Sequence, residues 1–499
     1  MSDMRKESDN ASVCAGQKTG LLSQIKQRLA GRTRGFAREE NGTMIIFGLT
    51  IFMMTLVATG MAIDFMRHEN MRTRLQATLD RAVLAAADLD QTNDPQEVVE
   101  DYFAKSGLQN YELDVDVQEG LNYRTVTANA TSTVNSMFLN MVGIESIDAP
   151  AGGAAEERIN NVEISLVLDI SGSMDDNDKI ENMQSAADEF VDTLITPDTK
   201  DLVSISVIPY TGQTNAGETL FNALNVDKKH DYSYCVEFDS SDFNSVALSF
   251  SKQYEQAQHY EYSSAYYGSN YNYKIQDPWC SDKETEEIKA FQNNNASLKN
   301  VIDSYRPRTA TGIHYAMKWG AALLDPSMRP IVSSMIAAGD VDPVFEGRPA
   351  DFMTDANDTG PASETVKVIV LMTDGMNVDQ YRIRDWAYNS TSEYQHWAKY
   401  TLWYYLYNYV YRNSRDDYYY KKYYSGTADD RLAAICQASR NAGIVIFTIG
   451  FEINDNPYSK GVMNNCATSD SHFYAVEGVE ISDAFGAIAR TINQLRLIQ

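Results

Sequence analysis

The sequence contains one long apolar run without a charged residue, Thr43–Ile63, which reads TMIIFGLTIFMMTLVATGMAI. As a helix this run would span about 30 Å, the thickness of the hydrocarbon core of a bilayer. The alternatives are a buried helix of a globular protein and the apolar region of a signal peptide. A signal-peptide region is shorter, about 7–15 residues, and ends at a small-residue cleavage site, which does not follow here. We therefore predict a retained transmembrane helix over residues 43–64.

The charges on the two sides of this run differ in sign. Residues 1–42 carry eight Lys or Arg against five Asp or Glu, whereas residues 65–499 carry 34 basic and 63 acidic residues. Because Lys and Arg mark the cytoplasmic side, we expect 1–42 to be a cytoplasmic tail and 65–499 to lie on the other side of the membrane. The net charge of −27 argues against nucleic-acid binding, which needs a basic surface.

The five cysteines agree with this topology. Cys14 lies in the predicted tail, and the other four lie in the exported part, where an oxidising compartment permits disulfides. Four cysteines allow three pairings, of which sequence proximity favours Cys235–Cys280 and Cys436–Cys466. Four unpaired buried thiols are the alternative. The sequence has no CxxC or HxxxH spacing that would indicate a zinc site.

Residues 65–158 read as a stalk helix followed by a small α+β module. Apolar residues keep a helical spacing beyond the membrane segment, and later segments alternate with the period of strands. The expected elements are a stalk over Asp64–Asp88, a helix over Pro95–Lys105, strands over Tyr111–Gln118 and Arg124–Thr131, a helical segment over Asn135–Val142, and a small, Ala- and Gly-rich linker that begins with Ile147–Gly153.

The character of the sequence changes at about residue 159. VEISLVLDI, residues 162–170, is an almost continuous run of β-branched residues and Leu, typical of a strand buried on both faces. Strands and helices then alternate, which predicts an α/β domain with a doubly wound, mostly parallel sheet over residues 159–499. The elements expected after this strand are helix Lys179–Leu194, strand Leu202–Pro209, helix Gly312–Leu324, strand Lys367–Met372, helix Arg431–Ala442, strand Ile444–Ile449 and helix Ile481–Leu497.

Two Tyr-rich insertions, at about 230–310 and 378–430, interrupt this alternation. Residues 230–310 contain ten Tyr and residues 381–424 contain fourteen, of 31 in the chain. Tyr supplies contact area at low entropic cost, as in binding surfaces, but it could equally pack the insertions onto the sheet. We expect both insertions at the edge of the sheet that carries the site described next. A third segment, Asp325–Glu364, is predicted to be a long loop because it is rich in Asp, Gly and Pro.

Small oxygen-bearing side chains follow two of the buried strands. Asp169, Ser171 and Ser173 alternate directly after the first strand, and Asp374 follows a later one in VIVLMTDGMN. In an open α/β sheet, ligands bind outside the carboxyl ends of the strands. Carboxylate and hydroxyl oxygens suit a hard divalent cation, Mg²⁺ above all, with Mn²⁺ or Ca²⁺ as alternatives. Two carboxylates against one divalent ion leave a nearly neutral site that can still accept an anionic ligand.

The motifs DISGSM and LMTDG resemble the metal-ion-dependent adhesion site (MIDAS) of von Willebrand factor A domains. By this resemblance, Ser171 and Ser173 would bind the metal directly, and Asp169 and Asp374 would act mainly through water. A threonine from a third loop would complete the set, and a carboxylate of a partner would take the open position.

The threonine has two candidates in the segment Arg308-Thr309-Ala310-Thr311-Gly312. The apolar spacing of GIHYAMKWGAALL places Thr311 at or next to the N-cap of the predicted helix. In A-type domains the ligand threonine precedes the first small buried residue of this helix by about five positions, and Ala316 satisfies that for Thr311. We therefore predict Thr311 as the ligand, with Thr309 as the alternative.

A second resemblance covers nearly the whole chain. The membrane segment followed by DFMR and RTRLQATLDRAVLAAA is similar to the N-terminal region of TadE/TadG-like Flp pilus-assembly proteins. AMKWGAALLDP, KVIVLMTDG, AGIVIFTIGFE and the C-terminal ISDAFGAIARTINQLRL extend the similarity to a TadG-type protein. The resemblance implies an inner-membrane anchor, an A-type domain outside the cytoplasm and a role in the assembly of tight-adherence pili.

These features predict a membrane-anchored, metal-dependent adhesion or assembly module that is not an enzyme. Its partner would be a protein that offers an acidic residue, such as a component of the pilus or secretion machinery or a surface ligand. A structural scaffold, in which the metal site only stabilises the fold, is the first alternative.

A metal-dependent hydrolase is the less favoured alternative. The sequence has no GxSxG, Walker A or HExxH motif, and its six His leave few general bases. His314 lies near the predicted site, but it reads as a surface residue on a helix.

Overall fold

The computed structural model describes residues 42–88, 91, 93–119, 123–262, 274–352 and 365–498. The predicted cytoplasmic tail lies outside the described residues, apart from Gly42. The chain forms two compact units: residues up to 119 together with 124–156, and residues 120–123 together with 157–499.

Helix α2, Gly42–Ala87, runs without a break from the apolar run into the predicted stalk. It is long and apolar enough to cross a membrane. Apolar side chains of its first half, such as Met44, Phe47 and Phe52, are exposed. The last part of the helix, from Leu75 to Ala87, instead buries one face in a core.

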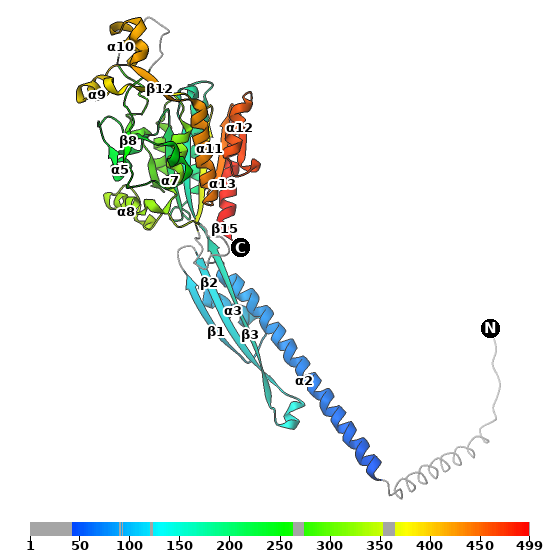
Figure 1. The fold of residues 1–499 in the computed structure, drawn as a ribbon. Coiled ribbons are helices and arrows are strands. Elements are labelled where there is room, and N and C mark those ends of the chain that lie inside the picture. Colours follow the sequence, from blue (N-terminus) through cyan, green and yellow to red (C-terminus); the bar gives the residue numbers. More distant parts are fainter. Residues whose placement is uncertain are drawn as a thin grey trace, which may run out of the picture. The chain divides into compact units, whose positions relative to one another are not determined.

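The partner of that buried face is a sheet with the order β1-β2-β3 (Figure 1). β1, Tyr111–Glu119, and β2, Tyr123–Asn135, pair antiparallel, and β3 spans Ser146–Ile159. Helix α3, Pro95–Lys105, completes the unit. It begins at Asp94, whose carboxylate accepts hydrogen bonds from two backbone N–H groups of the first turn.

Two predictions for this unit are wrong. Where a helical segment was expected over Asn135–Val142, β2 continues to Asn135 and only Leu139–Val142 form a 3-10 turn, η1. The predicted linker is the long strand β3. Its small residues let it approach α2: a Cβ on Gly153 would lie 2.8 Å from Cδ2 of Leu79. The Ala and Gly residues of this segment, which suggested a linker, instead allow the strand to pack closely on α2.

The second unit contains the predicted α/β sheet, and its order confirms the fold class. The order is β14-β13-β10-β4-β5-β9, and every pairing is parallel except that of β9 with β5. In chain order this is 3-2-1-4-5-6, the order of doubly wound folds, which reverses at β4. The strands are β4 Asn161–Asp169, β5 Val203–Tyr210, β9 Lys289–Gln292, β10 Thr365–Thr373, β13 Val445–Phe451 and β14 Phe473–Val476.

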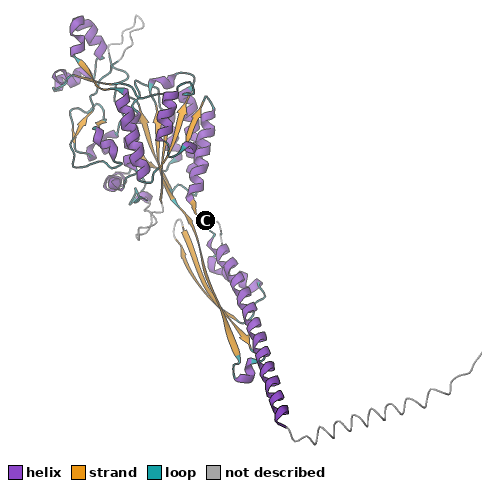
Figure 2. Ribbon diagram, turned by 45° about the vertical axis from the view of Figure 1, so that its right-hand side comes forward, coloured by secondary structure: helices purple, strands orange, loops and turns teal. Residues whose placement is uncertain are grey.

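Helices cover both faces of this sheet (Figure 2). One face packs on α4 Lys179–Leu194, α6 Asn295–Asp303 and α13 Glu480–Arg496. The other packs on α7 Ile313–Leu323, α11 Ser425–Asn441 and α12 Pro457–Cys466. The short β15, Leu497–Ile498, pairs with the last residues of β3.

Sequence analysis misplaced some elements of this unit. β9 and α6 belong to the sheet and its covering layer, although they fall within the first predicted insertion. The predicted loop Asp325–Glu364 contains a helix, α8 Arg329–Ala338. β9 and β14 each have only four residues, too few to show a period.

The two insertions share one hydrophobic core. Tyr260 and Trp279 of the first pack with Trp397, Leu402 and other residues of the second. Tyr260 is buried, so some tyrosines pack the insertions, whereas Tyr409 and Tyr411 are exposed. A binding role for the exposed tyrosines stays a prediction. The first insertion contains β7 Val236–Glu237 and β8 Tyr254–Gln256, and the second contains β11 Gln380–Ile383, α9 Thr391–Trp397, α10 Leu402–Tyr409 and β12 Tyr419–Tyr423. Two short elements precede the first insertion, α5 Gly217–Ala223 and β6 Val226–Asp227.

The shared core lies at the carboxyl edge of the sheet, as expected. The Trp279 indole packs so tightly on Gly212, two residues after β5, that a Cβ there would lie 2.9 Å from it. The indole N–H also donates to Gln380 at the start of β11, 3.0 Å away. Helices α9 and α10 project from the body of this unit (Figure 1).

Both predicted disulfides are present, Cys235–Cys280 in the first insertion and Cys436–Cys466 between α11 and α12. The two cysteines of the first disulfide are 45 residues apart in the sequence, and those of the second are 30 residues apart.

We expect loss of the Cys436–Cys466 bond, in a Cys436→Ala, Cys466→Ala variant, to lower the free energy of unfolding by about 3–4 kcal/mol, because the unfolded chain regains loop entropy. Chemical unfolding of both proteins under oxidising conditions measures the difference. Equal stabilities, or an unchanged mobility of the wild type on reduction, would contradict the bond.

Candidate metal site

Asp169 is the last residue of β4 and its carboxylate is fully buried. It accepts hydrogen bonds from the Ser171 backbone N–H at 2.8 Å, the Thr373 hydroxyl at 2.7 Å and the Tyr210 hydroxyl at 3.2 Å. Thr373 and Tyr210 end the neighbouring strands β10 and β5. One carboxylate therefore ties together the ends of three adjacent strands at the point where the strand order reverses.

The next turn, η2 Gly172–Asp175, brings two serine hydroxyls beside Asp374. Oγ of Ser171 lies 3.2 Å from Oγ of Ser173, and the Ser173 hydroxyl donates to Oδ1 of Asp374 at 2.7 Å. Oxygen atoms about 3 Å apart match the edge of an octahedron with metal–oxygen bonds of about 2.1 Å. The fold thus brings Asp169, Ser171, Ser173 and Asp374 together.

The donor set fits a hard cation. All its atoms are carboxylate or hydroxyl oxygens, which Mg²⁺, Mn²⁺ and Ca²⁺ prefer. Within the described ranges, no group of three or more His, Cys, Asp or Glu could hold a metal ion. A cation at this edge would therefore depend on the serine hydroxyls as well as on the carboxylates.

Burial, and then the neighbouring Asp374 carboxylate, raise the pKa of Asp169 to about 7. Both effects disfavour a second negative charge in this confined space. A divalent cation would reverse the balance, because it favours the ionised form of both carboxylates.

The threonine loop borders both parts of this cluster. The N-cap of α7 is Gly312, so Thr311 directly precedes it. The carbonyl of Thr309 accepts the Gly172 N–H at 3.1 Å, and the carbonyl of Thr311 accepts the Val378 N–H at 3.1 Å. These contacts are made by the backbone, so the choice between the two hydroxyls as ligand stays a prediction.

Lys179, the first residue of α4, was not anticipated from the sequence. Its ammonium lies 2.9 Å from Oδ2 of Asp374 and 3.7 Å from Oε2 of Glu452. Burial alone would lower the pKa of Lys179, but the hydrogen bond and charge of Asp374 outweigh it and raise that pKa. Asp374 therefore presents one oxygen to the serines and the other to a fixed positive charge.

His314 is not a surface residue, contrary to the prediction. It is fully buried, with Nδ1 3.0 Å from the Asn377 side-chain oxygen and Nε2 2.8 Å from the Tyr423 hydroxyl. Burial lowers its pKa to about 3, so it is neutral at pH 7. The prediction failed because α7 is buried on every side, with the insertions covering the part that a bare sheet would leave exposed.

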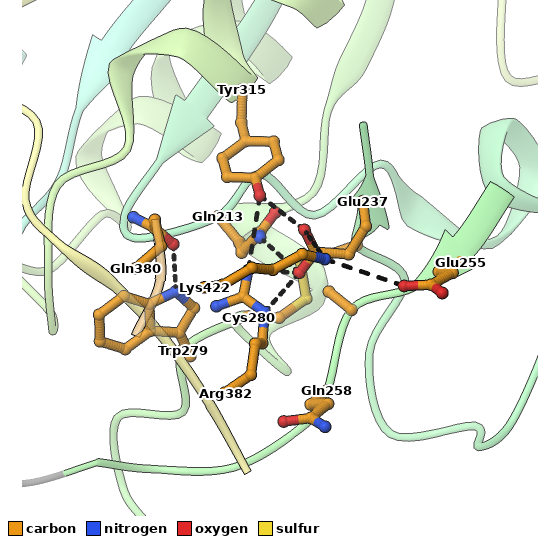
Figure 3. A network of polar contacts seen from close by, with 12 residues as sticks. Gln213, Glu237, Glu255, Gln258, Trp279, Cys280, Tyr315, Gln380, Arg382 and Lys422 are labelled. Carbon is orange, nitrogen blue, oxygen red and sulfur yellow. Dashed lines mark hydrogen bonds and ion pairs between the residues drawn. A yellow bond between two sulfur atoms is a disulfide. The ribbon is translucent and has the colours of Figure 1, made fainter. Parts of the chain in front are cut away.

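The hydrogen bonds continue from His314 through Tyr423 to a buried carboxylate, Glu237. Figure 3 shows Glu237 with its neighbours Tyr315, Arg382 and Lys422. The Tyr423 hydroxyl donates to that of Tyr315, and Tyr315 donates to Glu237, each at 2.7 Å. Although burial would raise the pKa of Glu237, the charges of Arg382 and Lys422 lower it to about 2. This network connects α7 with both insertions and, through His314, with the loop after Asp374.

Comparison with known proteins finds a family model that matches one part of the chain. Residues 42–89 match the model of the TadE/G-like Flp pilus-assembly family. No curated protein matches the sequence.

Solved structures with a similar fold include three proteins. The von Willebrand factor domain of the type V pilus tip protein Mfa5 from Porphyromonas gingivalis is 14% identical, with 68% of this chain and 98% of that chain covered and a TM-score of 0.35. The pilus adhesin SpaC from Lactobacillus rhamnosus GG is 10% identical, with 78% and 35% covered and a TM-score of 0.32. Proximal thread matrix protein 1 of the mussel byssus, whose structure has zinc in its MIDAS motif, is 14% identical, with 68% and 48% covered and a TM-score of 0.28. Because the identities and TM-scores are this low, we infer nothing about metal or partner binding by this chain from these structures.

We expect Lys179→Met to bind Mg²⁺ about tenfold more tightly than the wild type, because a positive charge beside the cation is removed. The same variant should be less stable without metal, since Asp374 and Glu452 lose their counterion. Calorimetric titration and thermal unfolding with and without Mg²⁺ measure the two effects. Lys179→Arg, which keeps the charge, is the control, and weaker Mg²⁺ binding by Lys179→Met would show that Lys179 chiefly orients Asp374.

We expect the free energy of unfolding of His314→Gln to fall less steeply than that of the wild type as the pH is lowered. The pKa of His314 is about 3 in the folded protein and about 6.5 when unfolded, so between these values the unfolded chain binds more protons. The contribution of neutral His314 to the free energy of unfolding is complete above pH 6.5. As the pH falls below that value, this contribution declines by up to about 1.4 kcal/mol per pH unit. Urea unfolding of both proteins from about pH 4 to pH 8 compares the slopes; equal slopes would contradict the burial of a neutral His314.

Proposed function

We propose that this protein is a membrane-anchored, non-enzymatic adhesion or assembly module of a Flp-type pilus system. In this proposal it binds a carboxylate of a protein partner through a divalent cation, Mg²⁺ above all. The observation that carries the proposal is the cluster of Asp169, Ser171, Ser173 and Asp374 at the point where the strand order reverses.

The charges of this cluster favour an acidic partner. Asp169, Asp374 and Glu452 carry three formal negative charges, and Lys179 balances one of them. A divalent cation would neutralise the rest and keep a coordination position open. An incoming carboxylate would then meet the cation and Lys179 without excess negative charge. Thr311 would complete the ligand set in this proposal.

The anchor is the first half of α2, which lies within the part that matches the pilus-assembly family. The Lys and Arg excess of residues 1–42 orients the N-terminus toward the cytoplasm in this proposal, and the second unit beyond the inner membrane. The two insertions border the carboxyl edge of the sheet, where they would contribute to the choice of partner.

Two other functions lead to different expectations. Hydrolysis would need a general base, and His314 does not fit this role, because it is buried, neutral and hydrogen-bonded at both nitrogens. A structural scaffold is favoured by one observation: Lys179 is itself a counterion of Asp374, at 2.9 Å.

The test is a pull-down from membranes with the full chain, in Mg²⁺ and in EDTA. We expect partner capture in Mg²⁺, and its loss in EDTA and in Asp169→Ala, because the cation bridges the two proteins. Thr311→Ala should weaken both capture and Mg²⁺ binding, since it removes one of about six ligands.

Thr309→Ala is the matched control, with the same change two residues away in the same loop, and it should bind Mg²⁺ as the wild type does. Lost affinity in Thr309→Ala beside normal affinity in Thr311→Ala would reverse the assignment. Capture that survives EDTA, with folded variants, would favour the scaffold, and turnover of a substrate would favour the enzyme.

A further inference from the structure

The turn between β2 and β3 carries an exposed apolar surface. Residues 136–144, SMFLNMVGI, contain no charged side chain. Met137, Met141, Val142 and Ile144 expose 66%, 62%, 56% and 46% of their surface. Four large apolar side chains in one short turn form a patch of the kind that marks an interaction site. We call residues 137–144 the hairpin tip.

The hairpin tip is fixed to α2 by hydrogen bonds. The side chain of Asp64 is only 2% exposed, and its carboxylate accepts the backbone N–H groups of Met137, Phe138 and Leu139 at 3.0, 2.7 and 2.8 Å. The tip therefore has a defined height along the helix.

A close packing contact sets the same height. The ring of Phe138 lies against Gly60, so that a Cβ on Gly60 would be 2.5 Å from the ring. Gly60 lies inside the apolar run, three residues before its last residue, Ile63. At 1.5 Å per residue, Phe138 therefore lies beside α2 about 4.5 Å before the end of that run, on the side of the apolar residues.

Charged residues begin just beyond the end of the apolar run, on α2 and on the hairpin alike. On α2, Arg67, Glu69 and Arg72 follow Asp64, and on the hairpin Glu145 and Asp148 follow the tip. Two separate chain segments thus change from apolar to charged at the same height. This is the pattern expected where a protein meets the surface of a bilayer.

We propose that the hairpin tip is a second membrane contact, which inserts its apolar side chains into the interfacial layer of the bilayer beside α2. The inference rests on the proposed membrane anchor. A lipid surface is the occupant because the patch continues the apolar surface of the membrane-spanning half of α2. Two contacts would limit the tilt and rotation of the helix more than one helix alone.

The test uses the full chain in liposomes, with single cysteines that carry an environment-sensitive fluorophore. A Cys14→Ser background removes the one cysteine outside the two disulfides. Met141→Cys reports on the tip, Ile51→Cys on the centre of the apolar run, and Gln118→Cys on the same sheet. Gln118 pairs with Thr125, which lies ten residues before Asn135, the end of β2 that leads into the hairpin tip. The distance along the strand from Thr125 to that end is about 33 Å.

We expect the label at Met141→Cys to shift its emission to the blue and to be quenched by lipids that carry a nitroxide near the headgroup. The label at Ile51→Cys should be quenched by nitroxides placed deep in the acyl chains, and that at Gln118→Cys by neither. Quenching at Ile51→Cys without quenching at Met141→Cys would overturn the hairpin contact and leave the anchor intact. Absence of quenching at Ile51→Cys would overturn the anchor itself.

A positioning variant adds a second readout. Gly60→Leu displaces the Phe138 ring, so it should reduce quenching at Met141→Cys while that at Ile51→Cys stays the same. Unchanged quenching at both positions would show that the α2 contact does not place the tip, and would contradict the proposed mechanism. Thermal unfolding of Gly60→Leu establishes that the variant is folded.

Discussion

The arrangement of the candidate metal site depends on the burial of one carboxylate. Asp169 is removed from water at the end of β4, where an unsatisfied charge would cost several kcal/mol. Its three hydrogen bonds come from Ser171, Thr373 and Tyr210, which belong to three different segments. The requirement for these partners fixes where β5 and β10 end and in which direction the serine turn leaves β4. The positions of the two serine hydroxyls and of Asp374 follow from it.

The sequence allowed the central part of this site to be predicted, because two continuous apolar strands end in small polar residues. Asp169 and Asp374 had to lie at one edge once both strands were assigned to one parallel sheet. Lys179 could not be found in this way, since a lysine at the start of a helix is usually solvated. His314 was misplaced because helical spacing shows which face meets the sheet, and not that an insertion covers the other face. The roles of the individual ligands remain predictions.

In the first unit, composition was a poor guide where packing governs. The Ala- and Gly-rich segment that resembles a linker is β3, whose missing side chains make room for Leu79 of α2. Gly60 has the same role for Phe138, and the proposed membrane contact of the hairpin tip depends on that packing. In both cases the glycine is explained by its neighbour in space, which the sequence alone does not identify.

The path of the chain between the hairpin and the site has a mechanical consequence. β3 ends at Ile159 and β4 begins at Asn161, so a nearly continuous extended backbone leads from Ser146 to Asp169, about 80 Å in contour length. Tension applied by a partner at Asp169 would be transmitted along this backbone into β3. The boundary between the two compact units falls inside β3, between Glu156 and Glu157, so no loop interrupts the backbone there. A chain that is already extended can lengthen little more without losing hydrogen bonds of its strands.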